Sequence, residues 1–476
     1  MENKTKILIV GAEALPFAAT GGLGDVLGSL PAALAREASD ADVRVVMPLY
    51  AKIGAQYREQ MTKEAEITVS LAWRQQYCGI YSLKKDGVIY YFIDNEYYFK
   101  RDGLYGFFDD GERYAFFSRA VMDMIPVIDF YPNVLHANDW QSALTVIYNR
   151  LYYRYPMKTV YTIHNIEYQG KYDNFILGDV FAIDNEHLSV VEYGGCINLT
   201  KGAIVCCDKL TTVSSRYADE IKDAFFAHGL ENIIRQSGDK LLGIVNGIDY
   251  DYYNPSTLDE KFSTSYRLFS GKAKNKAALQ KMLSLPEKAD TPIVSMISRL
   301  ASHKGFDLVK CVIEEAICTR DMQLILLGTG EKEYEEFFRY LADKYPDRVR
   351  ALFEFNKELS KKIYAGSDIF LMPSKSEPCG LSQMIASRYA TVPVVRETGG
   401  LYDTIKPFNP VTLEGNGVTF CSYNAHDMLD AINRTLDIYS DKELWKKLVR
   451  NAAEKDFSWN ASARLYLHMY ATLGNF

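Results

Sequence analysis

The sequence reads Lys6-Ile-Leu-Ile-Val10 and then Thr20-Gly-Gly-Leu-Gly-Asp25, and it repeats this form as Val392-Pro-Val-Val395 and Thr398-Gly-Gly-Leu-Tyr-Asp403. Each pair predicts a strand that leads through a turn into a helix. In an open α/β sheet, ligands bind at the carboxyl ends of strands, where glycines let backbone N–H groups approach an anion. One such turn alone would indicate only a tight turn. The matched pair favours a diphosphate site.

Short runs of β-branched and aromatic residues alternate with longer helical patterns along the whole chain. This alternation predicts βαβ units and a mostly parallel sheet. In the first half the expected strands are 6–10, 43–47, 88–93, 134–137, 159–163 and 209–213. In the second half they are 293–297, 324–327, 349–353, 369–372, 392–395 and 418–421, with helices such as 305–318 and 425–439. The sequence therefore predicts an α/β protein with two doubly wound domains.

The two series of strands define the expected domains. Residues 250–271 between them are polar and aromatic without clear periodicity. We therefore expect an N-terminal domain at 1–245 and a C-terminal domain at 246–457, followed by a last segment at 458–476. A final helix is expected over 462–473.

Composition and charge exclude several classes of protein. The chain has 476 residues, of which 48% are hydrophobic and 24% charged, which is typical of a globular protein and not of a disordered chain, a collagen or a coiled coil. Its 61 acidic and 54 basic residues give a net charge of −7, so neither nucleic acid nor an anionic membrane is an expected partner. The apolar stretch 7–19 is interrupted by Glu13 and Pro16, which favours a strand over a signal peptide.

Neither a metal nor a cofactor is expected. Asp139 and His136 could begin a metal site, but no third ligand appears at a suitable spacing. The eight cysteines contain no CxxC pair, which is typical of a reduced cytoplasmic protein.

A cationic loop follows one expected strand of the second domain. The sequence Ser298-Arg-Leu-Ala-Ser-His-Lys-Gly305 leaves that strand and enters an expected helix, so Arg299 and Lys304 lie at the carboxyl edge of the sheet. Positive charge at a helix N-terminus is disfavoured by the helix dipole, which indicates an anionic partner. Both side chains can stabilise the negative charge that grows on a leaving diphosphate. The simpler interpretation is a pair of solvated cations.

The sequence Ser374-Lys-Ser-Glu-Pro-Cys-Gly-Leu381 comes directly after another expected strand. We expect it to open a helix with Pro378 in the first turn, where its missing N–H costs nothing. Glu377 would then be a favourable charge near the helix dipole. At this edge its carboxylate could also bind sugar hydroxyls and stabilise positive charge at an anomeric carbon.

Two polar clusters end consecutive strands of the first domain, namely His136-Ala-Asn-Asp-Trp140 and Thr162-Ile-His-Asn-Ile166. Strand ends of this kind meet at one edge of a sheet. Asp139, His164 and Asn246 are therefore candidates for hydrogen bonds to a hydroxyl-rich substrate. Any one of them alone would more often be a capped turn or a satisfied core group.

Taken in order, the motifs resemble those of bacterial glycogen synthases, the starch synthase family. They are Thr20-Gly-Gly-Leu-Gly-Asp25, His136-Ala-Asn-Asp-Trp140, His164-Asn-Ile166, Asn246-Gly-Ile-Asp249, Ser298-Arg-Leu300 with Lys304-Gly305, Glu377-Pro-Cys-Gly-Leu381 and Thr398-Gly-Gly-Leu401. They cover nearly the whole chain. The resemblance implies a GT-B fold, in which two Rossmann-like domains border a deep cleft and the last helix crosses back to the first domain.

The resemblance also implies an activity. This is the retaining, metal-independent transfer of glucose, usually from ADP-glucose, to the nonreducing 4-hydroxyl of an α-1,4-glucan such as glycogen. The first domain would then be the acceptor side and the second would bind the nucleotide sugar. The catalytic residues implied are Glu377, Arg299, Lys304, Asp139 and His164. The implied substrate contacts are Gly21, Gly22, Asp25, Asn246, Phe355 against the adenine, Cys379, Gly380, Leu381, Thr398, Gly399 and Gly400.

Two positions depart from the wider pattern. The family usually has Lys before Thr-Gly-Gly-Leu, whereas this chain has Ala19, so one expected cation near the diphosphate is missing. Related retaining transferases often carry a second Glu where this chain has Ile385, but bacterial glycogen synthases commonly lack it.

Other functions compete with this interpretation. A GT-B transferase that uses UDP-glucose and a small acceptor fits the motifs at 136–140 and 377–381 less well. A glucan phosphorylase needs a pyridoxal lysine and a much longer chain. A glucan-binding or regulatory paralogue with weakened catalysis is supported only by Ala19.

Overall fold

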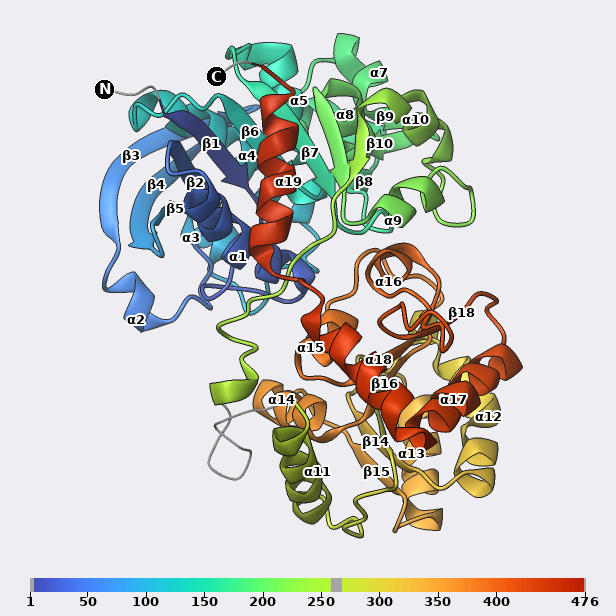
Figure 1. The fold of residues 1–476 in the computed structure, drawn as a ribbon. Coiled ribbons are helices and arrows are strands. Elements are labelled where there is room, and N and C mark those ends of the chain that lie inside the picture. Colours follow the sequence, from blue (N-terminus) through green and yellow to red (C-terminus); the bar gives the residue numbers. More distant parts are fainter. Residues whose placement is uncertain (1–3, 258–267, 475–476) are drawn as a thin grey trace. The chain divides into compact units, whose positions relative to one another are not determined.

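The computed structural model describes residues 4–257 and 268–474, and the chain forms two compact units (Figure 1). Unit 1 comprises Met1–Gly247 together with Trp459–Phe476, and unit 2 comprises Ile248–Ser458. Of the irregular stretch at 250–271, residues 258–267 lie outside the described residues. The expectation of an α/β protein with two wound domains is confirmed.

Unit 1 is built on a nine-stranded sheet with the order β12-β11-β7-β6-β1-β2-β5-β4-β3. From β12 to β5 neighbouring strands are parallel, and β5, β4 and β3 pair antiparallel. The bounds are β1 (Thr5–Val10), β2 (Ala41–Pro48), β3 (Thr62–Leu71), β4 (Arg74–Lys85), β5 (Val88–Asp94), β6 (Val134–Asn138), β7 (Lys158–Ile163), β11 (Lys209–Thr212) and β12 (Leu241–Gly243). A small second sheet contains β8 (Lys171–Tyr172), β9 (Glu192–Tyr193) and β10 (Cys196–Asn198). All six strands expected in this half of the chain are present.

Helices connect the strands of unit 1. They are α1 (Gly22–Glu37), α2 (Ala55–Arg58), α3 (Glu96–Phe99), α4 (Asp110–Val127), α5 (Trp140–Tyr148), α6 (Leu177–Phe181), α7 (Leu188–Val191), α8 (Leu199–Cys206), α9 (Ser215–Glu220) and α10 (Glu231–Gln236). None of the helices in the described part of either unit has the length and apolarity needed to cross a membrane.

The last helix of the chain, α19 (Trp459–Ala471), packs on α1 within unit 1 (Figure 1). It begins three residues before the expected helix at 462–473. A buried hydrogen bond of 2.7 Å joins Tyr470 Oη to His136 Nδ1 on β6. At the surface, Arg464 forms an ion pair with Glu37 at the end of α1. Helix α19 is therefore part of the core of unit 1.

Unit 2 is built on a six-stranded parallel sheet with the order β15-β14-β13-β16-β17-β18. The strands are β13 (Ile293–Ile297), β14 (Gln323–Leu327), β15 (Val349–Leu352), β16 (Ile369–Met372), β17 (Val392–Arg396) and β18 (Val418–Phe420). The helices are α11 (Ser270–Met282), α12 (Phe306–Thr319), α13 (Lys332–Lys344), α14 (Lys357–Gly366), α15 (Ser382–Arg388), α16 (Gly399–Thr404), α17 (Ala425–Ser440) and α18 (Lys442–Glu454). The central strands are buried along their length, as expected of a sheet with helices on both faces.

Candidate active site

Three loops of unit 2 follow the adjacent strands β13, β16 and β17, so they share the carboxyl edge of its sheet. Arg299, in the first loop, is exposed, and its guanidinium has no hydrogen bond or ion pair with any described residue. Lys304, five residues later, is half-buried and ends the same loop before α12. One exposed and one half-buried cation thus lie at this edge of the sheet.

Lys304 is paired with the acidic residue of the second loop. Its Nζ donates to Glu377 Oε2 at 2.6 Å, and the hydroxyl of Ser374 donates to the same oxygen at 3.0 Å. Gly305 lets the two loops come this close, because it has a φ of +81° and a Cβ there would lie 2.2 Å from Pro373 O. Glu377 is 7% exposed, so its carboxylate is held in one position beside the ammonium group.

The loop that follows Glu377 differs from the expected helix start. Helix α15 begins at Ser382, so Pro378 lies four residues before the helix and not in its first turn. Gly380 takes a φ of +73°, which is incompatible with a continuous helix from Pro378. Cys379 is buried, and Leu381 is the residue before α15. The expectation for Pro378 was therefore wrong, and Glu377 is held by Lys304 and Ser374 rather than by a helix dipole.

The glycine turn of the third loop, Thr398 to Leu401, packs directly on this second loop. A Cβ at Gly399 would lie 2.0 Å from Glu377 O, and a Cβ at Gly400 would lie 2.0 Å from Cys379 O. The glycines are thus needed for contact between the two loops.

We expected the N–H groups of this turn to meet a diphosphate. In the structure, three of them already donate to backbone carbonyls. These bonds run from Thr398 N to Arg396 O at 2.9 Å, from Gly400 N to Glu377 O at 3.0 Å and from Leu401 N to Thr398 O at 3.0 Å. Contact of Thr398, Gly399 and Gly400 with a substrate therefore stays a prediction.

Phe355, the residue expected against an adenine, lies in the segment after β15 and is 86% exposed. Strand β15 is separated from β13 by β14. An exposed ring there can stack on a planar ligand, but its contact with a nucleotide also stays a prediction.

In unit 1, the first glycine turn is held by a residue that the sequence analysis had not assigned to the site. Glu13 is 3% exposed and accepts hydrogen bonds from the backbone N–H and the hydroxyl of Thr20, both at 2.6 Å. It also accepts the N–H of Gly21 at 3.3 Å. Gly22 and Asp25 lie in the first turn of α1, and Ala19, just before Thr20, is exposed. The first amides of this turn are thus occupied by a carboxylate of the protein itself.

Asp139 and His164, expected at neighbouring strand ends, are in contact. The backbone N–H of His164 donates to Asp139 Oδ1 at 2.8 Å. Loss of solvent raises the pKa of the Asp139 carboxyl to about 7, opposed by hydrogen bonds from the backbones of His164 and Asn165, while the charge of Glu13 adds to the rise. Burial lowers the pKa of His164 to about 3, so its imidazole is neutral.

The other histidine of these motifs, His136, is not at the site. It is fully buried, and its two ring nitrogens bond Tyr470 Oη at 2.7 Å and Thr162 Oγ1 at 2.6 Å. Both ring nitrogens of His136 are therefore bonded to other side chains of the protein. Across residues 4–257 and 268–474, no group of three His, Cys, Asp or Glu side chains could hold a metal ion.

Asn246 follows β12, two strands away from β7 at the same edge of the sheet. It is 7% exposed, and its side-chain Oδ1 is buried without a hydrogen-bond partner. No hydrogen bond between described residues joins it to Asp139 or His164. Because an unpaired buried carbonyl oxygen is costly, this atom calls for a hydrogen-bond donor from a ligand or from water.

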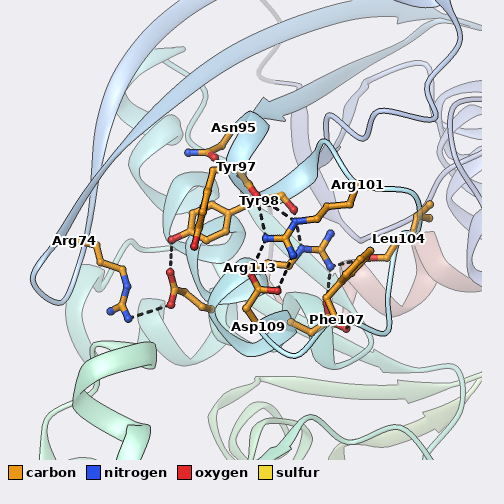
Figure 2. Close-up of polar contacts among 11 residues, drawn as sticks. Arg74, Asn95, Tyr97, Tyr98, Arg101, Leu104, Phe107, Asp109 and Arg113 are labelled. Atoms are coloured by element: carbon orange, nitrogen blue, oxygen red, sulfur yellow. Dashed lines mark hydrogen bonds and ion pairs between the residues drawn. The ribbon is translucent and has the colours of Figure 1, made fainter.

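An arginine cluster fixes the loop between α3 and α4 (Figure 2). Arg101 forms two hydrogen bonds to the carboxylate of Asp109, at 2.9 and 2.7 Å. The fully buried Arg113 donates to the carbonyls of Tyr98 and Leu104, at 2.7 and 3.0 Å. Figure 2 shows both guanidinium groups inside the same loop.

Tyr105 lies in the same loop and has a buried phenol. Burial, and to a smaller extent the charge of Glu13, raises the pKa of its phenol.

Sequence reasoning missed Glu13, Asn138 and the arginine cluster. Glu13 stands between two apolar residues, and its spacing from Thr20 has no regular period, so only the folded turn brings them together. Asn138 was part of a quoted motif, and its place beside Asp139 at a strand end was a usable signal.

Comparisons with known proteins agree along the whole chain. The family description "Starch synthase catalytic domain" matches residues 6–236, and "Glycosyl transferases group 1" matches residues 280–455. Glycogen synthase from Geobacillus stearothermophilus is 46% identical over 98% of both chains. Glycogen synthase from Clostridium novyi is 47% identical over 98% of this chain and 99% of its own.

Solved structures match as well. The catalytic domain of starch synthase IV from Arabidopsis thaliana, bound to ADP and acarbose, has a TM-score of 0.89 and 32% identity, with 99% of each chain covered. Sucrose-phosphate synthase from Thermosynechococcus elongatus has a TM-score of 0.61 at 18% identity, which is a likeness of fold alone.

Proposed function

The chain belongs to the glycogen synthase family of GT-B glycosyltransferases, and on that premise we propose that it transfers glucose from ADP-glucose to the nonreducing 4-hydroxyl of an α-1,4-glucan, with retention and without a metal. The observation that carries the proposal is the pairing of Lys304 with the buried Glu377, at the sheet edge that also bears the loop of Arg299.

In the proposed reaction the bond from the anomeric carbon to the diphosphate breaks, and its electron pair leaves with ADP. The 4-hydroxyl oxygen of the glucan forms the new bond to the anomeric carbon and gives its proton to the leaving diphosphate. Arg299 and Lys304 stabilise the charge that develops on the leaving oxygen. The carboxylate of Glu377 stabilises the opposite charge at the anomeric carbon. These three charges give the diphosphate and the glucosyl group different partners at one edge of the sheet of unit 2.

The positive charge that a metal would supply is already present in this arrangement. A guanidinium presents a fork of donors, whereas an ammonium is a compact charge, and both suit a diphosphate. This supports turnover without a divalent ion.

In unit 1, we assign Asp139, His164 and Asn246 to hydroxyl groups of the sugar substrates. Support comes from the unpaired Oδ1 of Asn246, which needs a donor, and from the neutral ring of His164. Hydroxyl groups of glucose can donate to both.

The choice of ADP-glucose over UDP-glucose rests on the starch synthase structure, which contains ADP. The exposed ring of Phe355 is available to stack on an adenine, and the same contact is weaker with a smaller base.

A release assay tests the proposal. The purified protein is incubated with glycogen and either ADP-glucose or UDP-glucose, with and without excess chelator, and the nucleoside diphosphate is measured. We expect ADP release that requires glycogen and continues in the chelator. The Glu377→Ala variant serves as the control for background hydrolysis. Glycogen binding without any release would contradict the proposal, and loss of activity on chelation, restored by a divalent ion, would contradict its metal independence.

A further inference from the structure

The ring of His164 is held by Asn138, the last residue of β6. Nε2 of His164 lies 2.9 Å from Asn138 Oδ1. The other end of the same amide, Nδ2, lies 3.2 Å from both Val10 O and His136 O. Backbone carbonyls only accept hydrogen bonds, so the end of the amide that meets them is the NH₂ group. The amide oxygen therefore faces His164.

This orientation determines which ring nitrogen of His164 carries the proton. An amide oxygen only accepts, so Nε2 of His164 must donate. A neutral imidazole has a single ring proton, which leaves a lone pair on Nδ1.

The surroundings of His164 keep the ring neutral. Burial lowers its pKa to about 3. Asp139 bonds the backbone N–H of His164, and the other titratable neighbour, His136, is also neutral because burial lowers its pKa to about 3.

We propose that Asn138 is a positioning residue that fixes His164 as the Nε2–H tautomer and so leaves Nδ1 as a hydrogen-bond acceptor for a hydroxyl of the sugar substrate. This inference rests on the proposed function for the identity of the ligand. The site then recognises a hydroxyl group that donates a hydrogen bond. A sugar analogue with fluorine in place of that hydroxyl therefore binds no better than the deoxy analogue.

Asn138 is itself immobile, which such a role requires. It is 1% exposed. Its backbone N–H donates to Ser142 Oγ at 2.6 Å, and the hydroxyl of Ser142 donates to the backbone oxygen of Asn138 at 2.7 Å. The amide therefore cannot rotate without losing two hydrogen bonds to carbonyls.

Nitrogen-15 NMR of the full-length protein tests the tautomer directly. The protein is labelled at its seven histidines, and the signals of His164 are identified by their loss in His164→Asn. We expect the Nε2–H pattern of a neutral ring throughout pH 5.5 to 8.5, with only a small shift near pH 7 as Asp139 ionises. An Nδ1–H pattern, or protonation of the ring within this range, overturns the inference. The readout needs no enzyme activity, so it stands apart from any failure of the proposed function.

The Asn138→Asp variant changes the charge of the same contact. A carboxylate beside Nε2 favours the imidazolium, so His164 should now titrate within this pH range. Asn416→Asp is the matched control, because Asn416 is also buried and bonds Lys406 N at 2.7 Å and Thr404 O at 3.0 Å in unit 2. The control should leave the His164 signals unchanged. If Asn138→Asp does not fold, the parent spectrum still decides.

A double-mutant cycle separates positioning from structure. Asn138→Ala should lower kcat/KM for the sugar donor about tenfold in the parent, but less than about twofold in the His164→Asn background. Equal losses in both backgrounds would show that Asn138 acts on the fold and not through His164.

Discussion

At the scale of single residues, the charges of unit 2 dominate the expected chemistry. Arg299→Ala and Glu377→Ala should each lower turnover by on the order of 10² or more, because each removes charge stabilisation that is strongest in the transition state. Arg299 is exposed and has no partner among the described residues, so its variant should unfold at the same temperature as the parent. Turnover assays and thermal unfolding check both statements. Near-parental turnover of a folded variant would mean that the reaction takes place elsewhere.

Ala19 offers a test by addition rather than removal. It is exposed and directly precedes the turn held by Glu13, so a lysine there can reach past the turn without displacing core atoms. If a diphosphate binds nearby, Ala19→Lys should tighten donor binding about five- to tenfold through a charge-assisted contact. Donor dissociation constants of both proteins provide the measurement. An unchanged constant would show that position 19 is remote from the diphosphate.

Asp139 predicts a pH dependence of stability. Its pKa rises from the ordinary 3.8 to about 7 in the folded protein. The folded state therefore binds the proton more tightly, so this group stabilises the fold below about pH 4, and that contribution is lost as the pH rises through 7. Asp139→Asn removes this dependence and keeps an oxygen for the N–H of His164.

Urea unfolding of parent and variant from pH 5 to pH 8 measures this effect. As the pH rises from 5 to 8, the free energy of unfolding of Asp139→Asn should increase relative to that of the parent by up to about 2–3 kcal/mol. Parallel pH curves would show that the carboxyl titrates normally.

At the scale of elements, the two Thr-Gly-Gly-Leu turns should respond differently to the same substitution. A Cβ at Gly400 would meet Cys379 O at 2.0 Å, whereas a Cβ at Gly22 has nothing within 4 Å. Gly400→Ala should therefore cost about 2 kcal/mol or more of stability and most of the activity, since it separates the loop of Glu377 from the turn.

Gly22→Ala is the matched control and should keep or slightly raise stability, because alanine favours the first turn of α1. Thermal unfolding and turnover of both variants check the contrast. A fully stable Gly400→Ala would mean that the two loops move apart freely.

The same elements show what the sequence could predict. Strands such as β13 and β16 are buried runs of apolar residues, and both were expected with their observed bounds. The long hairpin of β3 and β4 was missed, because one of its faces is exposed and charged residues alternate with apolar ones along it. Buried central strands can thus be predicted from a single sequence, whereas the sequence pattern of half-exposed edge strands resembles that of loops.

The candidate site shows the same division. Asp139 and His164 were expected to meet because they end neighbouring strands, and they do. Pro378 was misplaced because a positive φ at Gly380 delays the helix, and no local signal distinguished this from a helix start. The contact between Glu13 and Thr20 could not be predicted, because it depends on how the chain folds between Val10 and Thr20.

At the scale of the whole molecule, unit 2 is inserted between the parts of unit 1. The fragment 1–247 lacks α19, whose side chains Trp459, Tyr466 and Tyr470 are buried in unit 1. It also leaves His136 without its partner Tyr470. We expect the fragment 248–458 to unfold cooperatively alone, and 1–247 to aggregate unless 459–476 is joined to it by a flexible linker.

Circular dichroism and thermal unfolding of the three fragments check this expectation. Equal melting temperatures for 1–247 with and without the helix would show that α19 is dispensable. The matched point variant in the full chain is Tyr470→Phe, which removes only the hydroxyl. It should lower the free energy of unfolding by about 1–2 kcal/mol.

The position of α19 at the end of the chain also affects how the protein is made. A ribosome adds roughly 5–20 residues per second, so the residues of unit 2 separate the completion of β12 from the appearance of α19 by roughly 10–40 s. During that time the nascent unit 1 has an uncovered apolar face on α1, which is a natural target for chaperones. Synonymous codons that slow translation after Gly247 should therefore lower the soluble yield more than the same codons placed before it.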